Sequence, residues 1–480
     1  MILALALTAL AQDDSDEGWG DEGWPDDDAW PSEEAWPDTP TTPAEPIKPP
    51  SPFSIDGQLS TEEALWIERL DTEPLAKARQ SVDLAVGFSK SGWRARAGGH
   101  AEVDPVYLGE DVDDSTRDAY GWQARPGELW VSKSFGPVDL TLGRQEVAWG
   151  EGNVVGLLDR VNPKDLREPG LADIDDVRLP VTMARIGFFA GSHKFEAIVV
   201  PEADWGYRSP PDGPFGLLPG LLEHQGIGQI TTDGLLTKQW SWEHQQPRWG
   251  LEVIQGFGRW SWKGEGLDLG LYAASVLDQQ GVIVGGDEPP NLLEDEIAIP
   301  VDHLRSTLFG HSGATTVGGA VLRWEAAAEL GRAVNVGNVV AQDASGLPVF
   351  DAQTTEIDAY TAMVGTSWAG IPRTTIDVEV GAGYIPDKPE DMLLPWGEVQ
   401  YALRAQHKLL RERLALTASG GGIGATLAYG FLVRADASYE LADGLRANLG
   451  YITYQPGDEL GPLVGLETHD RVFGGVHWSF

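Results

Sequence analysis

Charged side chains of both signs are frequent in the segment between residues 150 and 180, a grouping that could act on a solute. Rings of charged side chains set the selectivity of a pore where they line its narrowest part. A loop of this composition either folds into a channel and narrows it, or stays outside, held by ordinary surface ion pairs. We favour the first interpretation. The expected constriction residues are Arg144, Gln145, Asp159, Arg160, Asp165, Arg167, Asp176 and Arg178.

Groupings that would support catalysis are weak. The chain has nine histidines and no cysteine, and it contains no Gly-x-Ser-x-Gly elbow, HExxH motif or phosphate-binding loop. His303 and His311 near Asp302 are the candidates for a hydrolase, and His244 beside Glu243 is the candidate for a metal site. A hydrogen-bonded histidine without a catalytic role is the more frequent case. We therefore expect no catalytic residue, no metal and no cofactor. The formal charge of −40 argues against nucleic acid as a partner.

Period-two alternation of apolar and polar residues dominates the chain from residue 53 onward and indicates which elements position these charges. Between 320 and 330, Leu322 and Trp324 share one face, while Arg323 and Glu325 share the other. Alternation of this kind is typical of a β-strand with two different faces. The runs last 9 to 16 residues, a length that crosses a bilayer at a tilt, and strands in lipid must close into a barrel.

Eighteen such strands can be placed, and short and long connections alternate between them, as in bacterial outer-membrane barrels. Among them are strands expected at 80–89, 137–149, 266–277, 373–384 and 424–439. We predict an all-β fold, a transmembrane outer-membrane antiparallel β-barrel of about 18 strands (range 14–18) with a disordered N-terminal tail. A soluble propeller is the alternative, but it requires a repeat that the sequence lacks. The polar strand faces give the expected lumen residues Arg94, Arg96, Glu102, Asp139, Arg323, Glu325, Asp377, Glu379, Arg404, Arg434, Asp436 and Arg446.

The two ends of the chain carry expected sorting signals. The last strand ends with Val476, Trp478 and Phe480 on one face, which resembles the signal that barrel-assembly machinery recognises. Residues 1–11 are apolar and close on Ala-Leu-Ala, as a signal peptide does, although they lack the usual basic segment and are short, as if truncated. The expected surroundings are therefore the bacterial outer membrane, with its lipid bilayer and lipopolysaccharide.

Residues 12–52 form an expected tether between signal peptide and barrel, which occupies 53–480. Residues 13–46 hold thirteen acidic residues and no basic one, with tryptophans at 19, 24, 30 and 36. Charge repulsion and proline prevent such a segment from forming a core. The tryptophans either bind a periplasmic partner or the chain's own pore, or decorate a solvated spacer; the sequence leaves both open.

A family resemblance rests on about 45 positions. The stretch reads Gly-Arg-Gln at 143–145, Trp-Gly at 149–150, D.VNP.DLRE at 159–168 and DDVRLP at 175–180. It is similar to a family of large outer-membrane barrels of uncharacterised function, and its beginning resembles alginate-export and related porin-like barrels. Members of that family often accompany exporters of the resistance-nodulation-division class. The resemblance implies a porin-type barrel and transport of lipid or hydrophobic compounds.

Taken together, the sequence predicts a passive channel or export conduit for small or hydrophobic solutes, narrowed by an inward-folded loop at 150–180. The alternative is a closed barrel that serves as a membrane anchor, with the acidic tether binding a periplasmic partner. No enzymatic activity is expected.

Overall fold

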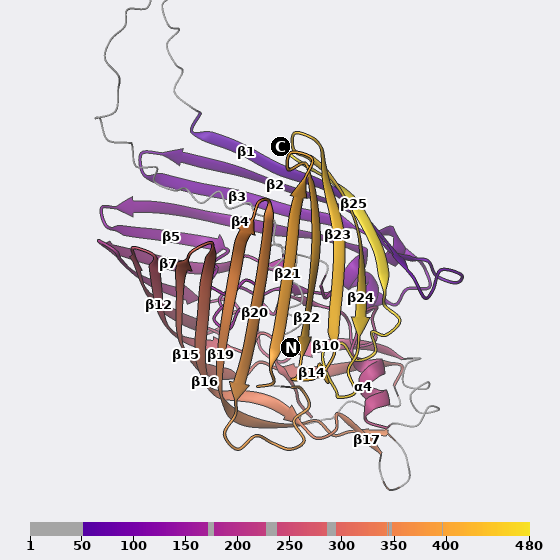
Figure 1. Ribbon diagram of the computed structural model, residues 1–480. Coiled ribbons are helices and arrows are strands. Elements are labelled where there is room, and N and C mark those ends of the chain that lie inside the picture. The colour runs from indigo at the N-terminus through magenta and orange to yellow at the C-terminus, as the bar shows by residue number, and fades with distance from the viewer. Residues whose placement is uncertain are drawn as a thin grey trace, which may run out of the picture.

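The computed structural model describes residues 51–170, 177–226, 238–285, 294–342, 344, 348–395 and 397–480. Its main element is a closed barrel of eighteen antiparallel strands, which confirms the predicted all-β barrel (Figure 1). The predicted signal peptide and nearly all of the predicted tether lie outside the described residues. In pairing order, the strands are β1 (Phe53–Trp66), β2 (Leu75–Lys90), β3 (Trp93–Val103), β4 (Trp122–Phe135), β5 (Val138–Gln145), β7 (Val181–Ala190), β8 (His193–Val200), β11 (Gln255–Gly264), β12 (Leu267–Leu277), β15 (Arg305–Val317), β16 (Ala320–Val336), β19 (Gln353–Ile371), β20 (Thr374–Tyr384), β21 (Gln400–Leu409), β22 (Leu414–Ile423), β23 (Phe431–Ala442), β24 (Leu445–Gln455) and β25 (Arg471–Ser479).

The barrel closes between its first and last strands. β25 pairs with β1 from Gln58↔Ser479 to Trp66↔Arg471. Gly57 and Phe480 then exchange two backbone hydrogen bonds of 3.0 Å each. Because every strand has two neighbours, the barrel leaves no free sheet edge for lipid to meet. The start of β1 and the end of β25 consequently lie at the same end of the barrel.

Short turns gather at this end of the barrel, and long connections at the other. Ser91 and Gly92, between β2 and β3, both have positive φ, 53° and 72°. That conformation suits a two-residue hairpin because its twist matches that of the strands. The connections that leave the opposite end contain short elements: η2 (Pro105–Leu108), α2 (Asp114–Thr116), η3 (Arg117–Gly121), β6 (Asp165–Leu166), β9 (Tyr207–Arg208), α4 (Leu218–His224), β10 (Gln239–His244), β13 (Val282–Ile283), β14 (Glu296–Asp302), β17 (Val340–Gln342) and β18 (Pro348–Phe350).

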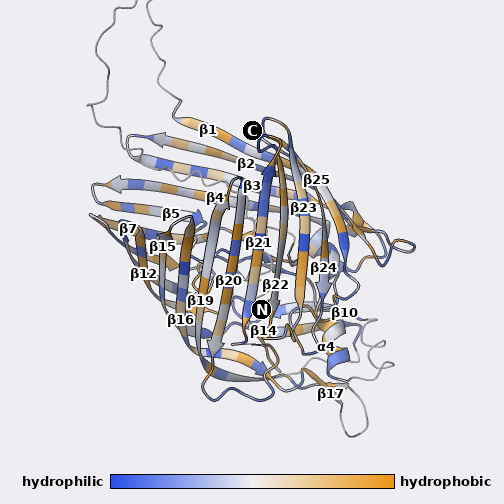
Figure 2. Ribbon diagram, viewed as in Figure 1, coloured by the Kyte–Doolittle hydropathy of each residue, from blue (hydrophilic) through white to orange (hydrophobic). Residues whose placement is uncertain are grey.

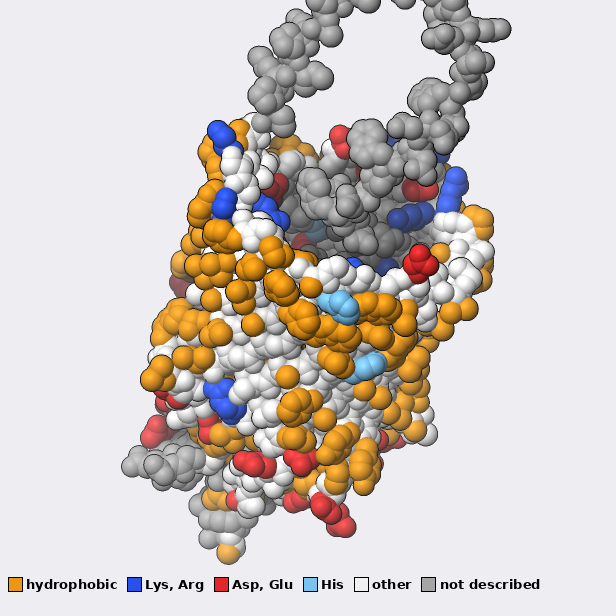
Figure 3. All heavy atoms as spheres, turned by 90° about the vertical axis from the view of Figure 1, so that its left-hand side faces the viewer, with side chains coloured by type: hydrophobic (Ala, Val, Ile, Leu, Met, Phe, Trp, Pro, Cys, Tyr) orange, Lys and Arg blue, Asp and Glu red, His pale blue; other side chains and the backbone are white. Residues whose placement is uncertain are grey.

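The two faces of the wall differ as the alternation predicts. Colours alternate along most strands in Figure 2. In Figure 3 apolar side chains cover much of the outer wall, while most charged ones lie near its two ends. Val364 on β19 is 64% exposed, and its neighbour Met363 is 1% exposed. An outer belt of this kind is the surface that a barrel presents to lipid. None of the helices in the described ranges combines the length and apolar character needed to span a bilayer.

Candidate functional site: a strap across the barrel

The chain leaves the wall after Gln145 and enters the barrel as a segment that we call the strap, residues 146–170. Trp149 is its first large anchor and is 3% exposed. Its ring lies 5.4 Å from that of Phe257 and 5.3 Å from that of Tyr272. Its Nε1–H donates to Glu196 of β8 over 3.2 Å. The strap therefore begins against the inner face of β8, β11 and β12.

Two wall carboxylates bind the backbone of the next turns. Glu325 of β16 accepts hydrogen bonds from the N–H groups of residues 151, 152, 157 and 158, over 2.5 to 3.2 Å. Glu379 of β20 accepts those of residues 153, 154 and 155, over 2.7 to 2.9 Å. Hydrogen bonds from N–H groups to a carboxylate are stronger than neutral ones. These two side chains hold an irregular backbone that no sheet or helix satisfies.

Small residues in the wall let the strap approach closely. A Cβ added at Gly310 of β15 would lie 2.2 Å from Leu158 Cδ2. One added at Gly381 of β20 would lie 2.8 Å from Val155 Cγ1. Val155 and Leu158 are both fully buried. Burial of two such side chains contributes about 3 to 6 kcal/mol, so the strap packs against this wall as well as hydrogen-bonding to it.

Asn162 fixes the bend at the middle of the strap. Its Nδ2 donates to the carbonyls of Gln145 (2.9 Å) and Leu179 (2.8 Å), and its Oδ1 accepts from the N–H of Val147 (2.8 Å). It is fully buried. One side chain thereby joins the start of the strap, its bend and the segment that returns to β7.

A buried ion cluster lies beside this bend. Asp159 Oδ2 is 2.9 Å from Lys164 Nζ and 3.0 Å from Arg178 Nε. Burial alone would raise the pKa of Asp159, but the two cations hold it below its usual range. The Asp159 carboxylate is therefore ionised at neutral pH.

The Asp-Leu-Arg-Glu stretch at 165–168 binds the barrel wall through alternating charges. Arg167 contacts Glu102 of β3 at 2.8 Å and Asp165 at 2.6 Å. Glu168 is 3.0 Å from Lys77 and 2.7 Å from Arg79. Arg125 of β4 and Arg471 of β25 complete the network with Asp165 and Glu168, at 3.6 and 3.2 Å. This part of the strap is thus attached to β2, β3, β4 and β25.

The two attachment sites lie on opposite sides of the barrel. In the pairing order β2 is second and β16 is eleventh, so nine of the eighteen steps separate them in either direction. The strap therefore runs across the lumen from the wall at β16 and β20 to the wall at β2 and β3.

A cavity of about 960 Å³ lies alongside the strap. Strands β1–β4 and β21–β25 line one side, and strap residues 165, 167 and 168 line another. Among the predicted lumen residues, Glu102, Arg404, Arg434, Asp436 and Arg446 face this cavity. Of the predicted constriction residues, Asp165, Arg167 and Arg178 do so.

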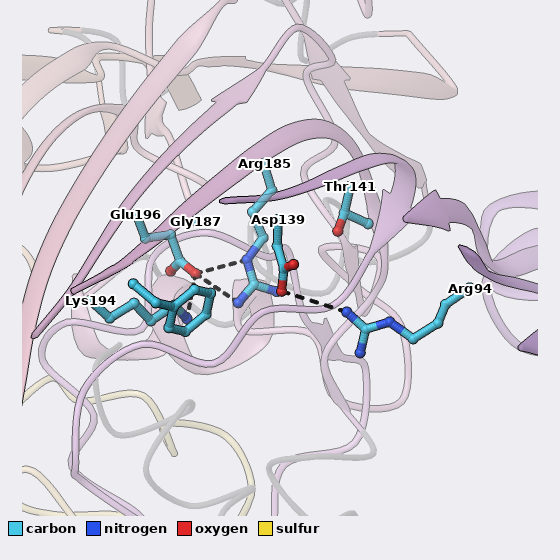
Figure 4. Close-up of a pocket in the computed structure, with 8 residues that line it drawn as sticks. Arg94, Asp139, Thr141, Arg185, Gly187, Lys194 and Glu196 are labelled. Carbon is cyan, nitrogen blue, oxygen red and sulfur yellow. Dashed lines mark hydrogen bonds and ion pairs between the residues drawn. The ribbon is translucent and has the colours of Figure 1, made fainter. Parts of the chain in front are cut away.

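Other predicted lumen charges are paired along the wall. A second cavity of about 250 Å³ contains Arg94 facing Asp139, and Arg185 and Lys194 pointing at Glu196 (Figure 4). Arg94 and Asp139 are 3.7 Å apart. Arg96 contacts Asp56 and Glu128 at 2.6 and 3.3 Å, and Arg323 lies 3.6 Å from Asp377.

Some predicted constriction residues lie apart from the strap's ion clusters. Arg144 binds Glu202 at 3.1 Å and the carbonyl of Pro180, and Gln145 donates to the carbonyls of Gly143 and Met183. Arg160 binds Glu329 of β16 at 3.3 Å. Asp176 lies outside the described residues. Lys77, Arg79 and Glu196 were not predicted; the strand expected at 80–89 begins at Leu75 instead, which adds Lys77 and Arg79 to the lumen face.

The predicted histidine groupings are partly brought together. His244 Nδ1 is 2.8 Å from His303 Nε2, whereas the ring of His311 lies 6.3 Å from that of Trp324, in the barrel wall. Within the described ranges, no group of three or more potential metal ligands is found.

One family model matches most of the chain. The family model described as "Protein of unknown function (DUF1302)" matches residues 37–455. The chain belongs to this family. That match agrees with the resemblance to a family of uncharacterised function noted above. No curated protein matches.

Solved structures similar to this member of the family include outer-membrane proteins. Pseudomonas aeruginosa OpdK, solved with vanillate, is 11% identical over 89% of this chain and 98% of its own, with a TM-score of 0.48. Acinetobacter baumannii OccAB2 is 10% identical over the same shares, with a TM-score of 0.47. OmpT of Vibrio cholerae, as a loop L8 deletion mutant, is 11% identical over 89% of this chain and 99% of its own, with a TM-score of 0.38.

Proposed function

We propose that the protein is a passive channel or conduit of the bacterial outer membrane for small or hydrophobic solutes, narrowed by the strap. One observation carries this proposal: the strap is attached to opposite walls, and a polar cavity of about 960 Å³ remains beside it. A solute that passes along the barrel must therefore pass the strap. The charges of residues 165, 167 and 178, with those of the facing wall, line the cavity that the solute would cross.

The decisive experiment is single-channel conductance of the refolded barrel in a planar bilayer. The test variants are the double substitution Glu325→Gln with Glu379→Gln, and a deletion of residues 155–177. Glutamine offers one acceptor oxygen and turns an NH₂ group toward the strap N–H groups, so the strap should detach. We expect stable currents that at least double in both variants.

Asp139→Asn is the matched control, because it neutralises a lumen carboxylate that does not contact the strap. Folding of each variant is checked by its heat-modifiable migration on a gel. If no folded variant carries a current, the proposal of a channel is wrong. That result would instead favour the membrane anchor, whose test is loss of partner binding on substituting the tryptophans of residues 13–46. That tether, its periplasmic placement and the assembly role of Val476, Trp478 and Phe480 remain part of the proposal.

A further inference from the structure

Arg208 projects from β9, which lies parallel to β6 of the strap with Arg208 opposite Leu166. Its neighbour Tyr207 lies beneath Arg125 and Arg167, with guanidinium-to-ring distances of 5.4 and 5.2 Å. Arg208 instead lies over the ring of Trp242 at 5.4 Å, and its Nη2 donates to the carbonyl of Gln279 over 3.4 Å. It therefore belongs to a different environment from the ion network of the strap.

The charge of Arg208 is not neutralised by a carboxylate. Arg160, Arg167 and Arg178 of the neighbouring strap segments each contact one within 3.3 Å. No carboxylate of the described residues lies within ion-pair distance of Arg208. Asp278, whose charge acts on it, is instead bound to Arg332 at 3.2 Å. Burial lowers the pKa of Arg208 to about 10, which is the electrostatic signature of a poorly compensated cation.

The ring of Trp242 lies against this guanidinium and is held in place, as is a stacked aromatic pair in the same environment. The indole N–H of Trp242 donates to the carbonyl of Ser209 over 2.8 Å. Trp205 stacks on His303, with ring centres 3.5 Å apart and planes 6° from parallel. The Nδ1–H of His303 donates to the carbonyl of Asp278 over 2.6 Å, which fixes that ring. The charge of Arg208 acts on His303 and on His244, so these rings belong to the same environment.

We propose that Arg208 and Trp242 form a binding site for an organic carboxylate with a planar apolar body. Arginine pairs with carboxylates through two parallel hydrogen bonds, and an indole face accepts a flat apolar group. The site adjoins the strap at the long-loop end of the barrel. This inference deepens the proposed function by naming a solute class, but the binding itself is measured without any current.

Calorimetric titration of the full-length folded protein in detergent with benzoate tests the site. Benzamide, which has the same shape without the charge, is the neutral probe. We expect benzoate to bind, benzamide to bind at least tenfold more weakly, and Arg208→Gln to weaken benzoate at least tenfold. Arg208→Lys should lose less. Arg69→Gln is the matched control, because Arg69 also lies over a tryptophan, at 5.1 Å from Trp66, outside this site.

Three results would overturn the proposal: no benzoate binding to the wild type, equal affinity for benzamide, or unchanged binding in a folded Arg208→Gln variant. Trp242→Leu gives a second test should Arg208→Gln fail to fold; it should weaken benzoate more than acetate. If the barrel conducts ions but does not bind benzoate, the binding site is wrong and the channel stands. If the barrel binds benzoate but carries no current, the channel is wrong and the binding site stands.

Discussion

At the residue scale, single side chains inside the barrel take the place of secondary structure. Glu325 and Glu379 satisfy seven backbone N–H groups between them, and Asn162 joins three segments. Alternation predicted that Glu325 and Glu379 face the lumen. It could not show that their partners are backbone amides, because every residue has an amide and no pattern marks which ones lack partners.

Replacing Asn162 with alanine should destabilise the strap strongly. The change leaves two buried carbonyls and one buried N–H without partners, each worth about 1 to 3 kcal/mol. We expect an unfolding free energy lower by about 3 kcal/mol or more in a denaturant titration, with faster proteolysis between residues 150 and 170. Asn153→Ala, in the same strap, should change neither by much. Equal effects of the two substitutions would contradict the role given to Asn162.

His303 should make stability depend on pH. Burial lowers its pKa to about 3, while the unfolded residue titrates near 6.5. Between these values the unfolded chain binds the proton and the folded protein does not, so stability falls as pH drops from 6.5 toward 3. Wild type and His303→Asn should therefore lose stability at different rates over this range in denaturant titrations. If the unfolding free energies of the two proteins change in parallel with pH, His303 does not contribute to the pH dependence of stability.

At the element scale, strand identity was predictable and strand ends were less so. The strands expected at 266–277 and 373–384 are β12 and β20, displaced by at most one residue. The strand expected at 424–439 begins at Phe431. Leu427 and Tyr429 alternate as strand residues do, but Leu427 has a φ of 61° and Gly430 one of 101°, so the chain turns there. Likewise the strand expected at 137–149 ends at Gln145, because Trp149 is buried inside the barrel.

A disulfide between the strap and the wall should fix the strap in place. The chain has no native cysteine, so the pair Leu158→Cys with Gly310→Cys would be unique. Combined with Glu325→Gln and Glu379→Gln, the oxidised protein should conduct as the wild type does. Reduction should then raise the conductance to that of the double glutamine variant. Equal conductance of the oxidised and reduced protein would show that the position of the strap does not control the current.

At the whole-molecule scale, the barrel separates an apolar exterior from a charged interior. The number of strands and their direction followed from alternation and from the two kinds of connection. The path of the strap did not, because contacts between residues more than 150 positions apart leave no periodic trace in one sequence. The charges of 150–180 indicated an inward fold without showing that both walls bind it.

An arginine in the middle of the outer belt should therefore be costly. Val364→Arg, near the centre of β19, is expected to destabilise the barrel in lipid vesicles by about 2 to 4 kcal/mol. Ser60→Arg, which faces the large cavity, should cost far less because water is available there. Unfolding titrations of both in the same vesicles make the comparison. Similar losses would show that the outer face does not meet hydrocarbon.

A cylinder with a rod fixed across its diameter resists being squeezed into an ellipse. The strap joins β16 and β20 to β2 and β3 in this way, with carboxylate contacts at both ends. Lateral pressure from the surrounding bilayer would have to break these contacts before the cross-section could change. In the proposed channel, the diameter available to a solute would then be set by the length of one internal segment, and membranes of different tension should leave it unaltered.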